Sequence, residues 1–591
     1  MILQALVSHY ETLLRQGKLE APGISPVRAS FALRLNAQGE LLQLMNLKTP
    51  VLKGKKEVFS PQEFNLPTPP KKGTGITPGF LSGNATYLLG LDSKGDLPWS
   101  LNRYHAARDL HLELLDGIDT PSAKAIRLFF ETWQPENAAI HPALSETLEE
   151  LAAGAVLIFM VNTDFAQEDR EILSAWQKHY DSFDPDAVQM PCLVTGKSAT
   201  IARLHPIIKG VRNAQSMGTN LVSFNAPAFL SYNRDQGYNS PVGEYAAFAY
   251  GAALNHLLAD RAHSQLIGDT TVVFWSEAGD TESQDVFGGC LWGFQNQDEE
   301  RTLAESDIGF MIQAVSRGEP VDWSALTLKA ETPFYVLGLV PNAARLSVRF
   351  FLRDSFGAMV EHLREHYERL RIAASNRDQG SSLSLWWLLN ETVNQKLQTK
   401  APIPQLVGNV LWAILAGRNY PETLYNAVML RIRAEGKVTY RRAAILKAYL
   451  LKNWSNLQNI KEELEMPLDS TKETAVFLLG RIFSVLEKIQ IDAIENINRT
   501  LADKCLATAC ATPAMVFDSL LVKSKYHLTK VHNKFKKKEE LQGLLDAYHV
   551  LHPDGFHEHL SHTERAEFML GYYLQDLKNW TGNTKEEKSH E

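Results

Sequence analysis

Two short motifs carry side chains that could perform catalysis. His362, Glu365 and His366 form an H-x-x-E-H pattern, in which two histidines one helical turn apart can bind zinc and the glutamate can act as a base. Arg364 and Arg369 lie close enough to repel a dication, and both histidines flank an apolar stripe. A solvated helix surface is therefore the expected structure, and a zinc-dependent hydrolase is the alternative function.

The second motif, Thr-Gly-Lys-Ser at residues 195–198, ends like a phosphate-binding loop. That loop requires a glycine five residues before Gly196, where this chain has Pro191, so its backbone amides cannot wrap a triphosphate. Four histidines near the end of the chain could bind a metal, although a polar loop between helices is the simpler interpretation: His552, His557, His559 and His562. We expect neither catalysis nor a metal or cofactor.

Basic side chains gather in several segments, where they could bind a polyanion. Residues 53–84 are rich in proline, which holds a chain extended, and in glycine, which lets a backbone approach a partner closely. Lysines can contact phosphates, and small polar side chains can reach base edges. The candidate contacts are Lys53, Lys55, Lys56, Lys71, Lys72, Thr74 and Asn84. The alternative is a solvated surface loop.

The second basic segment, residues 197–239, combines cations with asparagine-rich turns. Such turns could present amides and an aromatic ring to a nucleic-acid strand. The candidate strand contacts are Lys197, Arg203, Lys209, Arg212, Asn233 and Arg234, accompanied by Asn225, Tyr238 and Asn239. An ordinary network of Asx turns is the alternative.

The third segment is a predicted strand over residues 344–353. The pleat of a strand places Arg345, Arg349 and Arg353 on one face, at about 13 Å intervals, as a row of cations that suits a phosphodiester backbone. The residues predicted to face the core are Leu346, Val348, Phe350 and Leu352. The arginines could instead pair with acidic residues across a sheet.

Helical segments later in the chain carry further basic residues. Arg441 and Arg442 are candidate strand contacts, near Arg431, Arg433 and Lys447. Seven lysines with no acidic residue among them follow: Lys523, Lys525, Lys530, Lys534, Lys536, Lys537 and Lys538. Tyr526, His527, His532 and Phe535 are interleaved with them, which favours sequence-independent binding to a single strand. A charged surface that merely keeps a helical bundle soluble is the alternative.

The overall composition limits the extent of any nucleic-acid site. The 591-residue chain has a formal net charge of −8, so such a site must be a local basic patch on an acidic or neutral body. The four cysteines lack zinc-type spacing and are expected to be reduced. The sequence shows neither a signal-peptide core nor an apolar run of membrane-spanning length, so we expect a soluble cytoplasmic protein.

The elements that must position these residues indicate an α+β fold. Residues 1–340 read as mixed α/β, with strand-like stretches at 28–35, 156–161, 270–275 and 334–339. From about residue 355 apolar residues recur at helical spacing, in stripes over 356–370 and 478–497. We expect a mixed region to residue 340, a mostly helical region at 341–465 and a helical bundle at 466–591, which starts with a capping box at Ser470.

Several distinctive stretches resemble a known family over nearly the whole chain. They are IARLHPIIKGV (201–211), LVSFNAPAF (221–229), NSPVGEYAAFAYGAALNHLL (239–258), VVFWSE (272–277) and LVPNAARLSVRFF (339–351). GFLSGNATYLLG (79–90) and residues 420–450 are similar as well. The chain resembles the Csd-type large subunit of the type I-C CRISPR effector complex, Cascade.

This resemblance implies a non-enzymatic subunit. Such a subunit reads a protospacer-adjacent motif (PAM) in duplex DNA, helps to open the duplex, stabilises the R-loop and helps to recruit a separate helicase–nuclease. The implied partners are crRNA-bearing backbone subunits, crRNA-processing subunits, double-stranded target DNA and the displaced single strand. Small helical subunits translated from within the same gene are implied too, and Met466 is the expected internal start.

On this basis each basic segment receives a role. The segment from Lys71 to Asn84 is expected to read the PAM. The arginines of residues 344–353 are expected to guide a DNA strand, and residues 523–538 to hold the displaced strand. Base pairing with the guide would read the long sequence, while the protein reads a short motif.

Overall fold

The computed structural model describes residues 1–53, 56–68, 76–92, 95–180, 187–260, 263–292, 307–321, 323, 329–379, 381–396, 402–454, 464, 468 and 473–581. Helices account for 51% and strands for 16%, with sheets toward the N-terminus and helices toward the C-terminus, so the predicted α+β class is confirmed. The chain forms two compact units. The smaller comprises Tyr10–Arg203 and Ala226–Ala252, and the larger comprises Met1–His9, Leu204–Asn225 and Ala253–Glu591.

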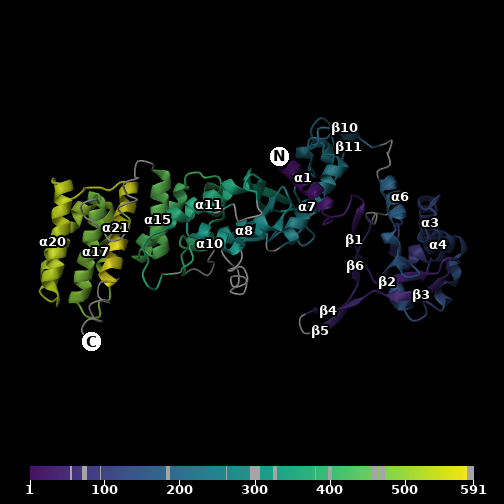
Figure 1. The fold of residues 1–591 in the computed structure, drawn as a ribbon, viewed down its shortest axis with the longest axis horizontal. Coiled ribbons are helices and arrows are strands. Elements are labelled where there is room, and N and C mark those ends of the chain that lie inside the picture. The colour runs from purple at the N-terminus through teal and green to yellow at the C-terminus, as the bar shows by residue number, and fades with distance from the viewer. Residues whose placement is uncertain are drawn as a thin grey trace. The chain divides into compact units, whose positions relative to one another are not determined.

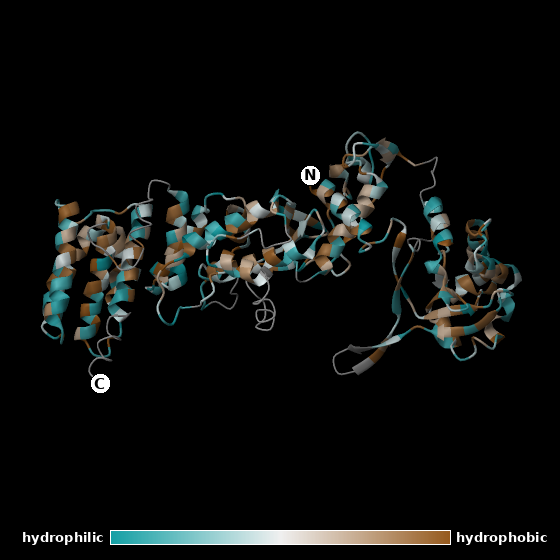
Figure 2. Ribbon diagram, viewed as in Figure 1, coloured by the Kyte–Doolittle hydropathy of each residue, from teal (hydrophilic) through white to brown (hydrophobic). Residues whose placement is uncertain are grey.

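The smaller unit is built on a mostly buried sheet. Its strands run in the order β3 (Leu41–Asn46), β2 (Phe31–Leu35), β8 (Val156–Val161) and β7 (Ser82–Asn84), with β9 (Asp164–Phe165) also paired to β8. β2 and β8 are parallel, and α4 (Pro121–Thr132) packs against both. Five of the six residues of β8 are buried, which confirms the predicted buried strand. These strands carry long brown, hydrophobic stretches in Figure 2.

A two-stranded ribbon extends from this sheet (Figure 1). β1 (Ile24–Ala29) pairs with β6 (Gln62–Pro67), and farther along β4 (Thr49–Lys53) pairs with β5 (Lys56–Ser60), both antiparallel. The strand predicted over 28–35 is therefore two strands, because the chain leaves the ribbon at Ala29 and enters the sheet at Phe31. Part of the segment 53–84, for which a surface loop was one interpretation, forms strands β5 and β6 of this ribbon.

Three longer helices complete the smaller unit. α3 (Leu97–Leu114) and α6 (Arg170–Tyr180) contact each other, and α3 also packs on α4. A short hairpin of β10 (Gln189–Pro191) and β11 (Ser198–Thr200) follows α6. The first helix of the chain is α1 (Ile2–Arg15), and Gly17 after it has φ +68°, a conformation that suits a helix end.

The larger unit contains a six-stranded sheet in the order β12, β13, β17, β16, β15, β14. β14 (Ser264–Ile267), β15 (Thr270–Ser276), β16 (Pro333–Asn342) and β17 (Arg345–Ser355) form an antiparallel meander, which confirms the strands predicted near 270 and 334. β12 (Ile207–Ile208) and β13 (Thr219–Asn220) extend it beyond β17. Phe274, Phe334 and Phe350 on one face join a core with α8 (Thr281–Trp292), α10 (Asp307–Ser316) and α11 (Phe356–Leu370).

The same core continues through the helices that follow. These are α12 (Leu385–Asn390), α13 (Pro404–Leu415), α14 (Glu422–Glu435), α15 (Tyr440–Asn453), α17 (Ala475–Ala493), α18 (Leu501–Ala511), α19 (Phe517–Leu528), α20 (Lys534–Leu551) and α21 (His562–Thr581). Helix α7 (Glu244–Ala259) contributes no residue to this core, and the smaller unit includes it as far as Ala252. The stripe predicted over 356–370 is buried in α11. The second stripe is buried in α17, which ends at Ala493, before the predicted end of the stripe at 497.

The start of α17 differs from the prediction in its cap. Ser470 and Met466 lie outside the described residues, and the N-cap of α17 is Thr474, whose side chain accepts from the Phe477 amide. The division at residues 340 and 465 stays a prediction. Among the described residues, no helix is long and apolar enough to cross a membrane.

Candidate nucleic-acid interface

The ribbon of the smaller unit carries the first candidate lysines at its far end. Lys53 and Lys56 are register partners at the closing end of the β4–β5 hairpin, and Lys55 lies outside the described residues. Phe59 is 65% exposed and Val58 is 42% exposed. A two-stranded antiparallel ribbon has the width that the major groove of DNA admits. The backbone of this hairpin therefore places two of the candidate lysine positions at the closing end of the ribbon.

Asn84 has a structural task that the sequence did not reveal. It is the N-cap of the short helix α2 (Ala85–Leu88), and its Oδ1 accepts from the Tyr87 amide at 3.2 Å. Loss of an N-cap side chain typically costs about 1 kcal/mol. Base reading by Asn84 stays a prediction, and any test of it must preserve the cap. Lys71, Lys72 and Thr74 lie outside the described residues.

The segment between Arg203 and Asn239 includes a tightly bonded loop. Arg203 forms an exposed ion pair with Asp235 at 2.8 Å. Asn239 accepts from the Ser231 amide and donates to the Arg234 carbonyl, both at 2.8 Å. The alternative of an asparagine turn network is therefore present here. Asn233 and Arg234 are exposed on the loop that this network holds.

The remaining cations of this segment are exposed and belong to different units. Lys197 lies in the turn of the β10–β11 hairpin of the smaller unit, where the phosphate-loop-like motif also falls. Lys209 and Arg212 lie in the larger unit. The Lys209 amide donates to Asn255 Oδ1 at 2.8 Å and the Arg212 amide to Thr271 Oγ1 at 3.1 Å, so both backbones are anchored. Contact of these side chains with a nucleic-acid strand stays a prediction.

The predicted arginine strand is β17, and its alternation is interrupted. Gly338 pairs with Phe350 and Leu339 with Val348, so Arg349 is an extra residue in a β-bulge. Val348 is 40% exposed, so the prediction that it faces the core is wrong, and the bulge accounts for the difference. The other residues predicted to face the core are buried: Leu346, Phe350 and Leu352.

Each of the three arginines contacts a neighbour in the larger unit. Arg345 donates to the side-chain oxygen of Asn225. Arg349 lies 3.2 Å from the Asp269 carboxylate, so the alternative of an acidic partner across the sheet holds for this residue. The exposed Arg353 guanidinium lies 5.9 Å from the centre of the Tyr335 ring. The prediction that β17 guides the phosphodiester backbone of a DNA strand stays a prediction.

Two adjacent arginines of α15 have different environments. Arg441 is half-buried, with its guanidinium 4.4 Å from the Trp387 ring centre. Arg442 is only 3% exposed, and it pairs with Glu391 at 3.0 Å and Glu435 at 2.6 Å. The predicted DNA contact by Arg442 is therefore wrong for the folded chain, because its charge is enclosed and neutralised. Lys447 is also buried, and it donates to a backbone carbonyl.

The richest basic segment is also the most exposed. It spans the end of α19 and the start of α20, where Tyr526 is 75% exposed and Phe535 is 79% exposed. Only Lys537 among its lysines is half-buried, and burial lowers its pKa. We call the following exposed residues the α19–α20 surface: Lys523, Lys525, Tyr526, Lys530, Lys534, Phe535, Lys536 and Lys538. Lysines beside solvent-exposed rings are the combination that holds a single strand without reading its sequence.

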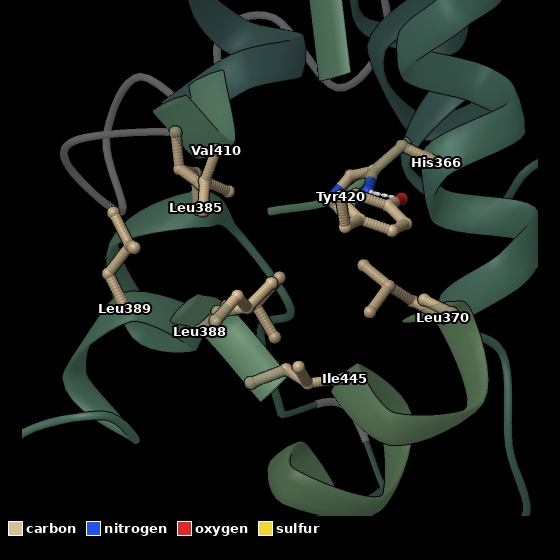
Figure 3. A pocket seen from close by; sticks show the side chains of 10 residues that line it. His366, Leu370, Leu385, Leu388, Leu389, Val410, Tyr420 and Ile445 are labelled. Atoms are coloured by element: carbon tan, nitrogen blue, oxygen red, sulfur yellow. Dashed lines mark hydrogen bonds between the residues drawn. The ribbon is translucent and has the colours of Figure 1, made fainter. Parts of the chain in front are cut away.

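The zinc-hydrolase motif does not assemble into a site. His362 Nδ1 lies 2.8 Å from the Leu415 carbonyl, and Glu365 pairs with Arg369 at 3.1 Å. Figure 3 shows His366 against Tyr420 in a leucine-lined cavity of about 10 Å³, which is room for one water molecule at most. Burial lowers the pKa of His366 to about 3. These contacts favour a structural role for the motif.

Two of the four histidines near the C-terminus are held by contacts in and beside their loop. His552 and His557 stack with ring centres 4.0 Å apart, and their Nδ1 atoms bond to the Gly555 carbonyl and the Tyr548 hydroxyl. In the part of the chain that the structure describes, no group of three or more His, Cys, Asp or Glu side chains is arranged to hold a metal ion.

Comparison with known families supplies the context for these basic surfaces. A family model described as CRISPR-associated protein (Cas_Csd1) matches residues 6–579. The chain belongs to this family. It is thus a large subunit of the type I-C Cascade, as the sequence resemblance predicted. No curated protein matches the chain.

One exposed residue of this Csd1-family chain escaped the sequence analysis. Tyr232 is 93% exposed and has φ +52°, and its loop neighbours Asn233 and Gln236 have φ +54° and +46°. Left-handed backbone is costly for such residues and often marks a functional loop. The ring beside Arg234 is a further candidate for stacking on a base. The asparagine-rich turn was visible in the sequence, but the outward direction of the ring was not.

Proposed function

We propose that this large subunit reads a PAM in duplex DNA, helps to open the duplex and stabilises the R-loop, without catalysis of its own. The guide RNA reads the long target sequence by base pairing, so the protein needs only a short and weak readout. One observation carries the proposal. A chain with a net charge of −8 concentrates exposed lysines and two exposed rings on the α19–α20 surface.

The duplex is assigned to the smaller unit. The β4–β5 ribbon fits a major groove, and Lys53, Lys55 and Lys56 supply phosphate contacts near its tip. The base edges are assigned to the segment from Lys71 to Asn84. Lys197, Arg203 and Arg234 of the same unit contact a DNA strand through its phosphates, and the Tyr232 ring stacks on a base.

The larger unit is assigned to separated strands. Lys209, Arg212 and the arginines of β17 guide one strand through its phosphates. The α19–α20 surface holds the displaced strand, because lysines bind any phosphodiester and rings stack on any base. This assignment predicts strong salt dependence and little sequence preference at that surface.

The proposed partners follow from the family context. They are the crRNA-bearing backbone subunits, the crRNA-processing subunit and a helicase–nuclease that is recruited on target binding. Small helical subunits translated from Met466 are a further proposal, and N-terminal sequencing of a copurifying fragment tests it. The proposed location is the cytoplasm.

Salt-dependent binding of single-stranded DNA by the full-length protein tests the α19–α20 surface. Each phosphate contact contributes about 0.7 to the slope of log K against log salt for a single strand. The double variant Lys530→Ala/Lys534→Ala should therefore flatten the slope by about 1.4.

The matched control removes two exposed lysines from the smaller unit, Lys124→Ala/Lys178→Ala. This control should leave the slope within error of the wild type. An equal loss in both variants, or no loss in the first, would contradict the assignment of the displaced strand to α19–α20.

A further inference from the structure

A cleft of about 290 Å³ lies between the first turns of α1 and the sheet of the larger unit. Met1, Gln4, Ala5 and Ser8 line it with the spacing of one helix face, and all lie in the larger unit. The opposite wall is lined by Glu277, which directly follows β15, and by three strand residues: Tyr335, Phe351 and Arg353. The volume lies at the lower limit for small-molecule sites, so the cleft suits a group the size of one ring system.

The sheet wall of this cleft is aromatic. Tyr335 is the register partner of both Trp275 and Arg353, so the three side chains form a row across β15, β16 and β17. The Trp275 and Tyr335 rings are 5.2 Å apart at an interplanar angle of 19°, and Tyr335 and Phe351 are 6.1 Å apart at 14°. These rings stack on one another as a platform in which Trp275 and Tyr335 are buried, at 0% and 3% exposed, so only the Phe351 ring is left for a nucleobase to stack on.

This wall faces away from the hydrophobic core of the unit. Successive side chains of a strand point to opposite faces, and Phe274 and Phe334, the chain neighbours of Trp275 and Tyr335, pack against the helices of the core. The ring row therefore lies on the other face, under α1. Phe351 is only half-buried there, so part of the platform is open to the cleft.

Two side chains of opposite charge flank the platform. Glu277 Oε1 accepts from the Tyr335 hydroxyl at 3.3 Å and from the Ser8 hydroxyl at 3.4 Å, which orients the carboxylate. Burial, followed by the charge of Glu277, raises the pKa of Tyr335, so the phenol keeps the proton that it donates. Arg353 lies over the edge of the same platform and is exposed to solvent.

We propose that this cleft binds one unpaired nucleobase of a single-stranded nucleic acid and fits guanine best. The base stacks on Phe351, its N1–H and N2–H groups donate to Glu277, and Arg353 contacts the adjoining phosphate. A carboxylate offers about four acceptor sites, so Glu277 can accept these donors in addition to the two hydroxyls. The inference rests on the proposed nucleic-acid binding and adds a base-selective site to it.

The carboxylate is the group that distinguishes guanine from the other bases. Adenine and cytosine present an amine beside a ring nitrogen that is itself an acceptor, and the acceptor repels a carboxylate. Uracil and thymine present one N–H between two carbonyl oxygens. Only guanine offers two adjacent donors to both oxygens of one carboxylate, and such charge-assisted paired bonds are the stronger kind.

The test measures binding of the full-length protein to short pyrimidine strands that contain one central guanine or one central adenine. Each strand is prepared as DNA and as RNA. Wild type should bind the guanine strand about tenfold more tightly, in at least one of the two chemistries. Glu277→Gln should remove this preference, and Phe351→Leu should weaken binding of both strands.

The control Asp354→Asn removes an exposed carboxylate from the next residue of β17, and it should retain the preference. A guanine preference in RNA alone points to the guide strand, and a preference in DNA alone points to a target strand. Equal affinity of wild type for guanine and adenine strands in both chemistries would overturn the proposal. The proposed function would still stand in that case, provided that binding remained salt-dependent and sensitive to Lys530→Ala/Lys534→Ala.

Discussion

Arg442 shows how strongly the environment of one residue can differ from that of its neighbour. Its guanidinium is enclosed between Glu391 and Glu435, whereas Arg441 lies at the surface over Trp387. Removal of one partner from a buried ion pair typically costs about 3–5 kcal/mol, because a charge remains without compensation. Arg442→Met should therefore lower the free energy of unfolding by about that amount.

Chemical denaturation of the full-length protein measures this effect. Arg441→Met is the matched control and should cost less than about 1 kcal/mol, as expected for a surface residue. If Arg442→Met weakened DNA binding while the unfolding free energy stayed unchanged, the structural role of Arg442 would be refuted.

Glu567 provides a pH-dependent prediction at the same scale. It is 6% exposed in α21, where Thr474 Oγ1 donates to it at 3.1 Å, and burial raises its pKa to about 7. The pKa of Glu567 is higher in the folded protein than in the unfolded protein. The protonated side chain therefore makes its full contribution to the free energy of unfolding below about pH 4.5, and this contribution is lost as the pH rises through about 7. Glu567→Gln should therefore be more stable than wild type at pH 8, by at most about 3 kcal/mol.

Thermal unfolding between pH 5 and pH 8 tests this prediction. The substitution should flatten the decline in melting temperature with pH, while Glu558→Gln, which changes an exposed carboxylate, should not. A decline as steep in Glu567→Gln as in wild type would assign the pH dependence to other groups.

At the scale of elements, the contact between α17 and α21 depends on two glycines. A Cβ atom added to Gly480 would lie 2.0 Å from the Phe568 carbonyl oxygen, and one added to Gly571 would lie 2.2 Å from that of Phe477. Since each obstacle is backbone, a methyl group can be accommodated only if the helices separate. Gly480→Ala and Gly571→Ala should each destabilise the protein by about 1–3 kcal/mol, the usual cost of overpacking.

Gly543 in α20 supplies the opposite expectation. No atom lies within 4 Å of a Cβ placed there, so Gly543→Ala should stabilise the helix by about 0.5–1 kcal/mol. Differential scanning calorimetry of the three variants compares the two cases. A stabilised Gly480→Ala variant would contradict the close packing of α17 on α21.

Elements with a strong local pattern were predictable from the sequence. The apolar stripe of α11 and the buried apolar run of β8 can each be recognised from the residues of that one segment alone. The bulge at Arg349 was not predictable, because one inserted residue changes the pairing without changing the composition. The β4–β5 hairpin was not predicted for a related reason. Its two short strands are defined by their pairing with each other, because their sequences show no periodic pattern.

The candidate site was predictable in part, for similar physical reasons. The exposure of the α19–α20 lysines follows from their density, because that many like charges cannot be buried together. The burial of Arg442 depends on Glu391, which is distant in the sequence, so no local pattern revealed it. The cleft at Glu277 joins the first residues of the chain to Glu277 and to residues of β16 and β17, which are distant in the sequence, and only the fold brings them together.

At the scale of the whole molecule, an acidic chain carries several separate basic surfaces. Their distribution over two units suits a protein that handles a duplex and its separated strands at different places. The family assignment supplies the guide-loaded complex in which these surfaces would act together. The central claim of this account is that the subunit reads base pairs beside the guide-matched sequence.

The most direct test measures binding of the reconstituted, guide-loaded complex to duplex targets that differ only in the base pairs flanking the guide match. We predict that affinity changes tenfold or more, about 1.4 kcal/mol, and that Thr74→Val, which removes a side chain able to reach base edges, erases the difference. Asn84→Ser retains an N-cap acceptor, so its effect reports on base reading rather than on the stability of α2. A difference that survives both variants would place the reader elsewhere in the chain. Equal affinity for all flanking base pairs would contradict the central claim.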